Sequence, residues 1–249
     1  DAFSFYTAMG AGFGLPRPVP TTNRPATVDV PDHDNYKFFL ETGTLQSFAR
    51  LAGDSVKFWK DLYAHPDYDE WWQARDARNA TKNLKPAMLW VGGHFDAEDN
   101  WGAWNAYKAA EENNPGKEFN KLVMGPWYHT QWAGKDGTHL GNIHFGSNTS
   151  LWYQQNIEIP FFQYFLKGKG SIDKIAEANI FVTGANEWKS FDKWPPAGKT
   201  DRKIYFTGGG KLSWDKPAAG DLYSEYLSDP SKPVPYTEDV HYNRTREYM

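Results

Sequence analysis

Three patterns of hydrophobic and polar positions follow one another along the chain. From residue 36 to residue 78, apolar residues recur at helical spacing between breakers, which predicts several short helices. The apolar runs 86–92 and 121–126 are continuous, and a helical pattern over 101–112 separates them. Continuous apolar runs are typical of parallel strands that are covered on both faces. The order strand, helix, strand therefore predicts a βαβ unit.

The remaining segments suggest a chain of three parts. Residues 12–35 are rich in Pro and lack periodicity, and residues 150–166 form a mostly apolar helical pattern with Pro160 inside it. Further along, short strand-like runs alternate with Gly, Pro and Asp, which is typical of an all-β module. We expect an irregular segment and short helices over 1–85, an α/β portion over 86–171, and a partial β-sandwich over 172–249.

Composition narrows the classes of function. The 249 residues carry 27 Lys and Arg against 31 Asp and Glu, a formal net charge of −4, so no basic face is expected for nucleic acid. No apolar run is long enough to span a membrane. The lack of Cys excludes a disulfide framework, a thiolate zinc site and a cysteine nucleophile. The 12 Trp, 14 Tyr and 16 Phe predict a well-packed folded protein.

Candidate chemistry follows the two strands of the predicted βαβ unit. The first run leads into GGHFDAED and the second into GPWYH, which bring Asp96 and His129 to the carboxyl ends of neighbouring strands. Substrate crevices of open α/β sheets form at those ends. A carboxylate that orients a proton-carrying His is the Asp–His part of a Ser-His-Asp triad. The alternative, an ordinary loop acid and a capping or core His, is left open by the spacing alone.

Several sequence words resemble one family of hydrolases. GGHFDAEDNWGAW and VMGPWYHT, with HPDYDEWWQARD upstream and IPFFQYFLKGKG downstream, are similar to the α-amino-acid ester hydrolase and cocaine esterase group of serine α/β-hydrolases. X-prolyl dipeptidyl peptidases are more distant relatives, and the resemblance covers nearly the whole chain. It implies an α/β fold with the second half of an α/β-hydrolase sheet, a helical cap, and the start of a C-terminal β jelly roll. It also implies Asp96 as the triad acid and His129 as the general base.

The nucleophile is the main departure from this family. The family places its Ser on a G-x-S-Y-x-G elbow before the cap, and no Ser of this sequence lies in a G-x-S-x-G word. Ser147 follows a Gly, but it comes after His129, and we interpret it as a loop residue. We therefore expect the nucleophile and the oxyanion hole to lie in a preceding part of the same protein. The chain by itself is then expected to be inactive.

The resemblance also implies a binding site for the substrate. In α-amino-acid ester hydrolases, carboxylates of a D-x-E-D word hold the ammonium group of the substrate, which points to Glu98 and Asp99, with Asp1 as a third carboxylate. His94 and Trp127, which lie near the acid and the base in sequence, are counted with the substrate-binding residues. The alternative for Glu98 and Asp99 is that they cap the helix that follows them.

The resemblance implies a serine hydrolase that acts on a small acyl substrate through an acyl-enzyme. Expected substrates are α-amino-acid esters or β-lactam-type amides, as for cephalosporin acylases, and no cofactor or metal is implied. Two alternatives stay open: an X-prolyl dipeptidyl peptidase, and a non-catalytic carbohydrate-binding module. A homo-oligomer is compatible with the sequence. Such relatives are often exported, which favours a periplasmic or secreted protein.

Other polar residues have no spacing typical of a metal site. His139 and His144 lie in a Gly-rich loop without recognisable ligand geometry, so we expect them to be surface residues. Asp32, His33 and Asp34 lack partners at defined spacing and are expected to form a solvated loop. The sequence thus offers one site with a chemical rationale, around Asp96 and His129.

Overall fold

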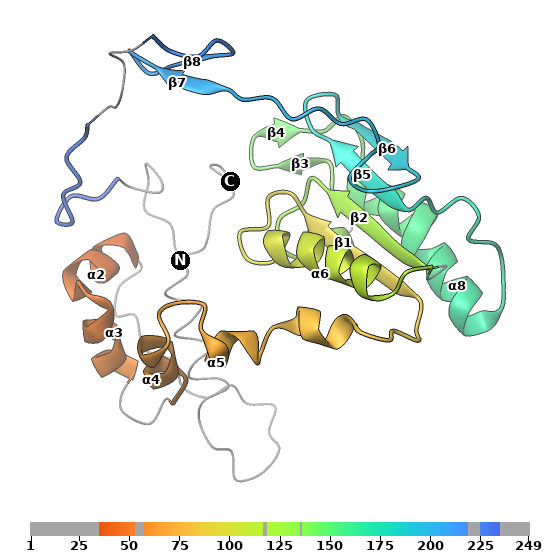
Figure 1. The fold of residues 1–249 in the computed structure, drawn as a ribbon, viewed down its shortest axis with the longest axis horizontal. Coiled ribbons are helices and arrows are strands. Elements are labelled where there is room, and N and C mark those ends of the chain that lie inside the picture. The colour runs from red at the N-terminus through yellow and green to blue at the C-terminus, as the bar shows by residue number, and fades with distance from the viewer. Residues whose placement is uncertain (1–34, 53–56, 117–118, 135, 219–224, 235–249) are drawn as a thin grey trace.

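A computed structural model describes residues 35–52, 57–116, 119–134, 136–218 and 225–234 of the chain. Figure 1 shows a mixed sheet with α6 over one face and α8 behind it, short N-terminal helices to one side, and a separate hairpin of β7 and β8. The chain is therefore a mixed α/β protein within these ranges.

The sheet is built around the predicted βαβ unit. Its strands are β1 (Met88–Gly93), β2 (Asn120–Gly125), β5 (Ala178–Val182) and β6 (Glu187–Phe191), in the order β1-β2-β5-β6. β1 and β5 run parallel to β2, and β6 is antiparallel to β5. Helix α6 (Asn100–Asn113) connects β1 to β2. The predicted strands, the helix between them and their parallel pairing are confirmed.

The expected start of an all-β module at residue 172 is wrong. The strand β5 pairs in parallel with β2, so the α/β portion continues through β6 to Phe191. The run ANIFV was ambiguous in sequence, because a short apolar run suits a sandwich strand and a buried parallel strand equally. Its first four residues are buried in the sheet. The hairpin of β7 (Tyr205–Thr207) and β8 (Lys211–Ser213) lies outside this sheet, and the jelly roll stays a prediction.

The core lies on both faces of the sheet, because successive side chains of a strand point to opposite sides. Leu122 and Met124 of β2 face α6 and pack in one cluster with Tyr107. Val123, between them, packs on the other face with Ile157. All three β2 side chains are fully buried. Helices on both faces are what a strand without polar alternation requires.

One long apolar segment forms the helical layer behind the sheet. It comprises α7 (Thr149–Tyr153), a π-helical turn (Gln154–Glu158) and α8 (Ile159–Lys167). Pro160 lies in the first turn of α8, directly after the wider π-helical turn. Proline cannot donate the backbone bond of a regular α-helix, and a π turn is a local departure from that bonding pattern. The predicted helix over 150–166 is therefore confirmed with an internal irregularity.

Short helices occupy the region before the sheet, as the breakers predict. They are α2 (Asn35–Thr42), α3 (Leu45–Ala52), α4 (Lys57–Ala64), α5 (Glu70–Gln73) and the 3-10 helix η1 (Ala77–Thr81). Asp69 caps α5, because its Oδ1 accepts hydrogen bonds from the backbone N–H groups of Trp71 and Trp72. A covering role of these helices over an active site stays a prediction.

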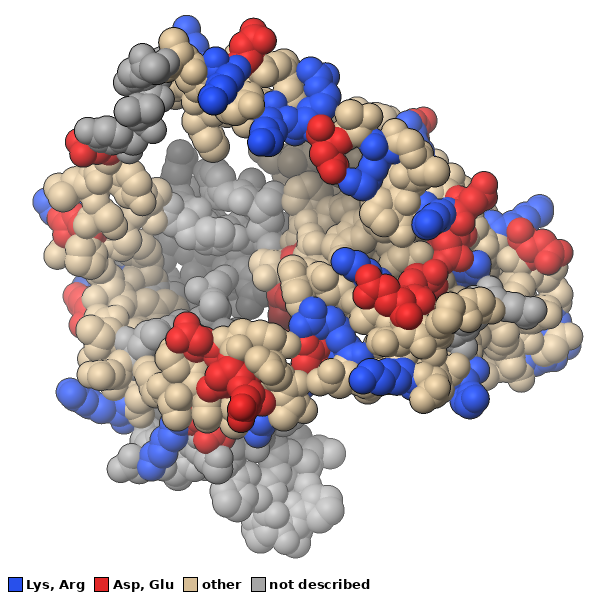
Figure 2. Space-filling view, in the orientation of Figure 1, with Lys and Arg blue, Asp and Glu red and all other residues tan. Residues whose placement is uncertain are grey.

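The visible surface carries charges of both signs. Lys and Arg alternate with Asp and Glu over the face shown in Figure 2. Among the described residues, no helix has the length and the apolar character that crossing a membrane requires.

A test of the packing at the strand ends uses two glycines. A Cβ added at Gly93 would lie 2.1 Å from the carbonyl oxygen of Trp127, whereas a Cβ at Gly102 in α6 meets nothing within 4 Å. We expect Gly93→Ala to lower the free energy of unfolding by about 1–3 kcal/mol or more through overpacking. Gly102→Ala is expected to raise it by about 0.5–1 kcal/mol, because alanine suits a helix interior. Urea unfolding of both variants checks this, and equal stability of Gly93→Ala and the unmodified protein contradicts it.

Candidate active site

Asp96 lies in the turn that follows β1. Its side chain is fully buried, and its Oδ1 accepts hydrogen bonds from the backbone N–H groups of Glu98, at 2.9 Å, and Asp99, at 3.1 Å. Such side-chain-to-backbone bonds let an Asp stabilise a tight turn. They fix the orientation of the carboxylate and direct Oδ2 to the neighbouring loop.

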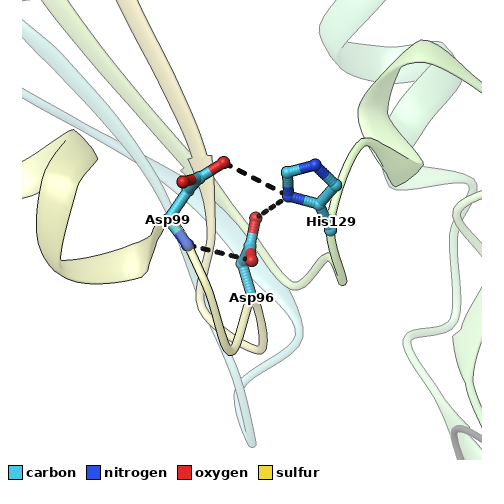
Figure 3. Close-up of side chains that lie close together, drawn as sticks. All are labelled: Asp96, Asp99 and His129. Carbon is cyan, nitrogen blue, oxygen red and sulfur yellow. Dashed lines mark hydrogen bonds and ion pairs between the residues drawn. The ribbon is translucent and has the colours of Figure 1, made fainter. Parts of the chain in front are cut away.

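His129 follows β2 and meets this carboxylate. Its Nδ1 lies 3.0 Å from Oδ2 of Asp96, while the ring remains 40% exposed. Figure 3 shows Nδ1 facing the carboxylates and the other ring nitrogen pointing away from them. A carboxylate that accepts a hydrogen bond from Nδ1 leaves Nε2 unprotonated and able to take a proton. The structure thus brings together the two residues to which the sequence assigns catalysis, in the orientation of a general base.

Asp99 approaches the same nitrogen. Its Oδ2 lies 3.2 Å from Nδ1 of His129, and its side chain is 56% exposed. Asp99 occupies the N-cap position of α6, but its side chain makes no capping hydrogen bond. Asp99 is thus the N-cap residue of α6 by position, but its carboxylate contacts His129 and not a backbone N–H group of the helix. Glu98, the neighbouring residue, is exposed.

Two further predicted site residues have structural partners. Nε2 of His94 lies 3.0 Å from the carbonyl oxygen of Phe181, and the ring stacks near Trp104. Trp127 is fully buried, and its Nε1 donates a 2.9 Å hydrogen bond to Oγ1 of Thr149. This burial corrects the expectation that Trp127 contacts a substrate, because none of its surface reaches solvent. The motif G-P-W-x-H does not reveal whether its Trp lies in the core or in a binding site.

The predicted third carboxylate and the nucleophile are not part of this geometry. Asp1 lies outside the described residues. Ser147 is exposed on its loop, and the buried Ser150 donates its hydroxyl hydrogen bond to the carbonyl oxygen of Gln131. In the part of the chain that the structure describes, no Ser hydroxyl is hydrogen-bonded to His129.

A small aromatic cluster lies under both loops of the site. Leu140, Phe145 and Phe181 are buried together. Phe95 and Tyr128, the residues that directly precede Asp96 and His129, pack against them. Sequence reasoning missed this support, because Leu140 and Phe145 lie in a segment that reads as a Gly-rich loop. The signal was present in the apolar residues that flank Gly141 and Asn142.

The three side chains of the site have two chemical capacities. Ligand atoms of Asp96, Asp99 and His129 lie within 4.8 Å of one another, which is close enough to hold a metal ion. However, the Asp96 carboxylate is already oriented by two backbone N–H groups and a His. That arrangement fits proton transfer by an oriented imidazole.

Comparisons with known proteins place this geometry in context. The model of the X-Pro dipeptidyl-peptidase (S15 family) matches residues 20–131, a range that includes Asp96 and His129. No curated protein matches the chain. A solved aminopeptidase from the marine sediment archaeon Thaumarchaeota archaeon superposes with a TM-score of 0.83 and 32% identity, over 99% of this chain and 39% of that one. A solved α-amino acid ester hydrolase superposes with a TM-score of 0.82 and 32% identity, over 96% and 39%. The chain thus spans about two fifths of the length of either structure.

The environment of His94 generates a prediction about pH. Burial lowers the pKa of His94 below its usual 6.5, and the hydrogen bond with the Phe181 carbonyl opposes this shift. Between the two pKa values the unfolded chain binds more protons, so the free energy of unfolding falls as the pH drops below about 6.5. The variant His94→Gln keeps an N–H donor for the carbonyl but does not titrate, and should lose this part of the pH dependence.

Urea unfolding of both proteins between about pH 8 and about pH 5 measures the difference. An identical pH dependence in the two proteins contradicts the assignment to His94.

Proposed function

We propose that this chain, which is similar to the X-Pro dipeptidyl-peptidase (S15) family over residues 20–131, supplies the Asp–His half of a Ser-His-Asp triad. The complete protein is then a serine hydrolase that cleaves ester or amide bonds. The observation that carries the proposal is the 3.0 Å contact between buried Asp96 and half-exposed His129.

The roles follow from the geometry of this pair. Nε2 of His129 takes the proton of a Ser hydroxyl as that oxygen attacks the substrate carbonyl, and then gives the proton to the leaving group. A water molecule attacks the resulting acyl-enzyme with the same help from His129. Asp96 holds the imidazole in one tautomer and stabilises its protonated form. The printed sequence holds no Ser on the required elbow, so we assign the nucleophile to a Ser outside it.

The proposed substrates are α-amino-acid esters or β-lactam-type amides. Asp99 and Glu98 are the proposed partners of the substrate ammonium group, because both carboxylates are exposed next to the pair. An ammonium ion held there by a charge-assisted hydrogen bond would lie close to the reacting carbonyl. A resident cofactor has no part in this mechanism.

A second candidate is an X-Pro dipeptidyl peptidase, which the family match favours. It would use the same Asp96 and His129 and would also bind the free amino end of its substrate. Turnover of a Gly-Pro amide compared with a phenylglycine ester separates the two candidates. A carbohydrate-binding module without catalysis is the remaining alternative, and it would not react with a fluorophosphonate that labels an activated Ser.

Substitution of the pair tests the proposed mechanism. In the complete protein, Asp96→Asn should lower kcat by about 10⁴-fold, because the wrong tautomer of His129 is then favoured. His129→Ala should lower it at least as far. A second Asp–His pair provides the control: Oδ2 of Asp69 lies 2.6 Å from Nδ1 of His65. Asp69→Asn keeps the cap of α5 and should leave kcat unchanged, whereas unchanged kcat in Asp96→Asn would refute the mechanism.

Substitution of Asp99 tests the proposed substrate class. Asp99→Asn should lower kcat/KM for a phenylglycine ester by about 10-fold or more, because the ammonium group loses a charged partner. The matched phenylacetate ester lacks that ammonium group and should lose much less. If both esters lose the same factor, Asp99 acts on His129 alone and the ammonium assignment fails.

A further inference from the structure

Two histidines face each other across a short hairpin near the site. The strands β3 (His139–Leu140) and β4 (Ile143–His144) are antiparallel, and His139 is the direct partner of His144. The backbone bond from Phe145 N to Thr138 O closes the next pair along the ladder. His139 and His144 therefore form a non-hydrogen-bonded pair, the type in which cross-strand side chains come closest.

The distance between the rings suits a shared ligand. Their centroids are 5.7 Å apart, with the planes tilted by 38°. A metal ion bonded tetrahedrally to two imidazole nitrogens at about 2.0–2.1 Å holds the ring centroids about 5 Å apart. A small rotation of either side chain closes the difference, since both rings are partly exposed.

Hydrogen bonds orient one of the two rings. Thr138 donates its hydroxyl to Oδ1 of Asp136 at 2.6 Å, and Nδ1 of His139 lies 3.0 Å from the same hydroxyl oxygen. Because the hydroxyl proton is already used, Nδ1 of His139 must be the donor in that contact. Its Nε2 is then unprotonated and available as a ligand. A chain from a carboxylate to the second nitrogen of a His is typical of the partners that orient metal ligands.

Hydrogen bonds and core packing stabilise the hairpin on the side of the protein interior. The buried amide of Gln131 donates to the carbonyl oxygens of Asp136, at 3.2 Å, and His139, at 3.0 Å. Leu140 and Phe145 anchor the other side in the aromatic cluster that supports Tyr128. The backbone that carries both rings is thus already ordered without a bound ion.

From this geometry we propose that His139 and His144 form a binding site, the hairpin site, for a divalent transition-metal ion. Imidazole nitrogens suit Zn²⁺, Ni²⁺ and Cu²⁺, and water would complete the coordination. Asp136 and Thr138 are positioning residues that hold the His139 ring. Both histidines lie at the surface, as the sequence predicts, and the register of the hairpin adds the pairing between them.

An ion at the hairpin site would also act on the neighbouring chemistry. It would link β3 to β4, and the hairpin packs through Leu140 and Phe145 on Tyr128, which precedes His129. Binding to the folded state alone raises the stability of that state. Metal binding at the hairpin site would therefore stabilise the region that packs against the loop of His129.

Calorimetric titration with Zn²⁺ alone, at about pH 7.5 where ordinary imidazoles are neutral, tests the proposal in the intact protein. We expect His139→Gln and His144→Gln each to weaken Zn²⁺ binding by about 10-fold or more. His65→Gln, at a half-buried histidine outside the hairpin, is the matched control and should bind as the unmodified protein does. Thermal unfolding without metal shows whether each variant folds, and added Zn²⁺ should raise Tm only where the pair is intact.

The group of Asp96, Asp99 and His129 is the competing location for the ion. Asp99→Asn should leave the calorimetric binding at the hairpin site unchanged. Loss of binding in Asp99→Asn together with full binding in His144→Gln would overturn the proposal and move the ion to the candidate active site. Absence of Zn²⁺ binding in the unmodified protein would overturn it as well.

Discussion

The parallel, in-register pairing of β1 and β2 is the constraint on which the candidate site depends. Gly93 and Gly125 are direct partners at the ends of these strands, so the two following loops start side by side. Asp96 and His129 each lie only a few residues beyond their glycine. A shift of the register would separate the carboxylate from Nδ1 of His129. The contact between Asp96 and His129 therefore depends on the backbone hydrogen bonds that pair β1 with β2.

Close packing makes this approach of the two loops possible. The carbonyl oxygen of Trp127 lies where a side chain of residue 93 would begin, and it also accepts a hydrogen bond from the N–H of Phe95. Behind them, Phe95 and Tyr128 share the cluster of Leu140, Phe145 and Phe181. A dense aromatic core leaves few alternative positions for the loops. Preorganisation of this kind is what an acid–base pair needs to act without rearrangement.

The apolar runs predict the βαβ unit and place Asp96 and His129 at neighbouring strand ends by a general rule for parallel strands, whereas the roles of the two residues as acid and base come from the family resemblance. Prediction from sequence fails where the same residue pattern occurs in two different structural environments. The run at 178–182 suits a sandwich strand as well as a buried parallel strand, and only long-range pairing with β2 decides between them. Trp127 is similar in sequence to a binding-site aromatic, but residues far along the chain, Tyr153 and Ile157 among them, pack around it in the core.

The same limit applies to the hairpin of His139 and His144. The two side chains become neighbours only through the register of β3 and β4. The sequence pattern does not predict this register, because each strand has two residues and lies in a Gly-rich segment. The sequence leaves helix capping and substrate binding open for Asp99, and it does not predict the contact of the Asp99 carboxylate with His129. Contacts between side chains of different loops are thus the part of the site that the sequence does not predict.

The hydrogen bond between Asp96 and His129 can be measured most directly by nuclear magnetic resonance of the imidazole protons. A proton on Nδ1 that is held by a buried carboxylate should give a downfield signal, which His129→Gln removes. Asp96→Asn should shift or abolish this signal, while Asp69→Asn, in the separate pair with His65, should leave it in place. A His129 signal that is the same in Asp96→Asn and in the unmodified protein would contradict the hydrogen bond between Asp96 and His129.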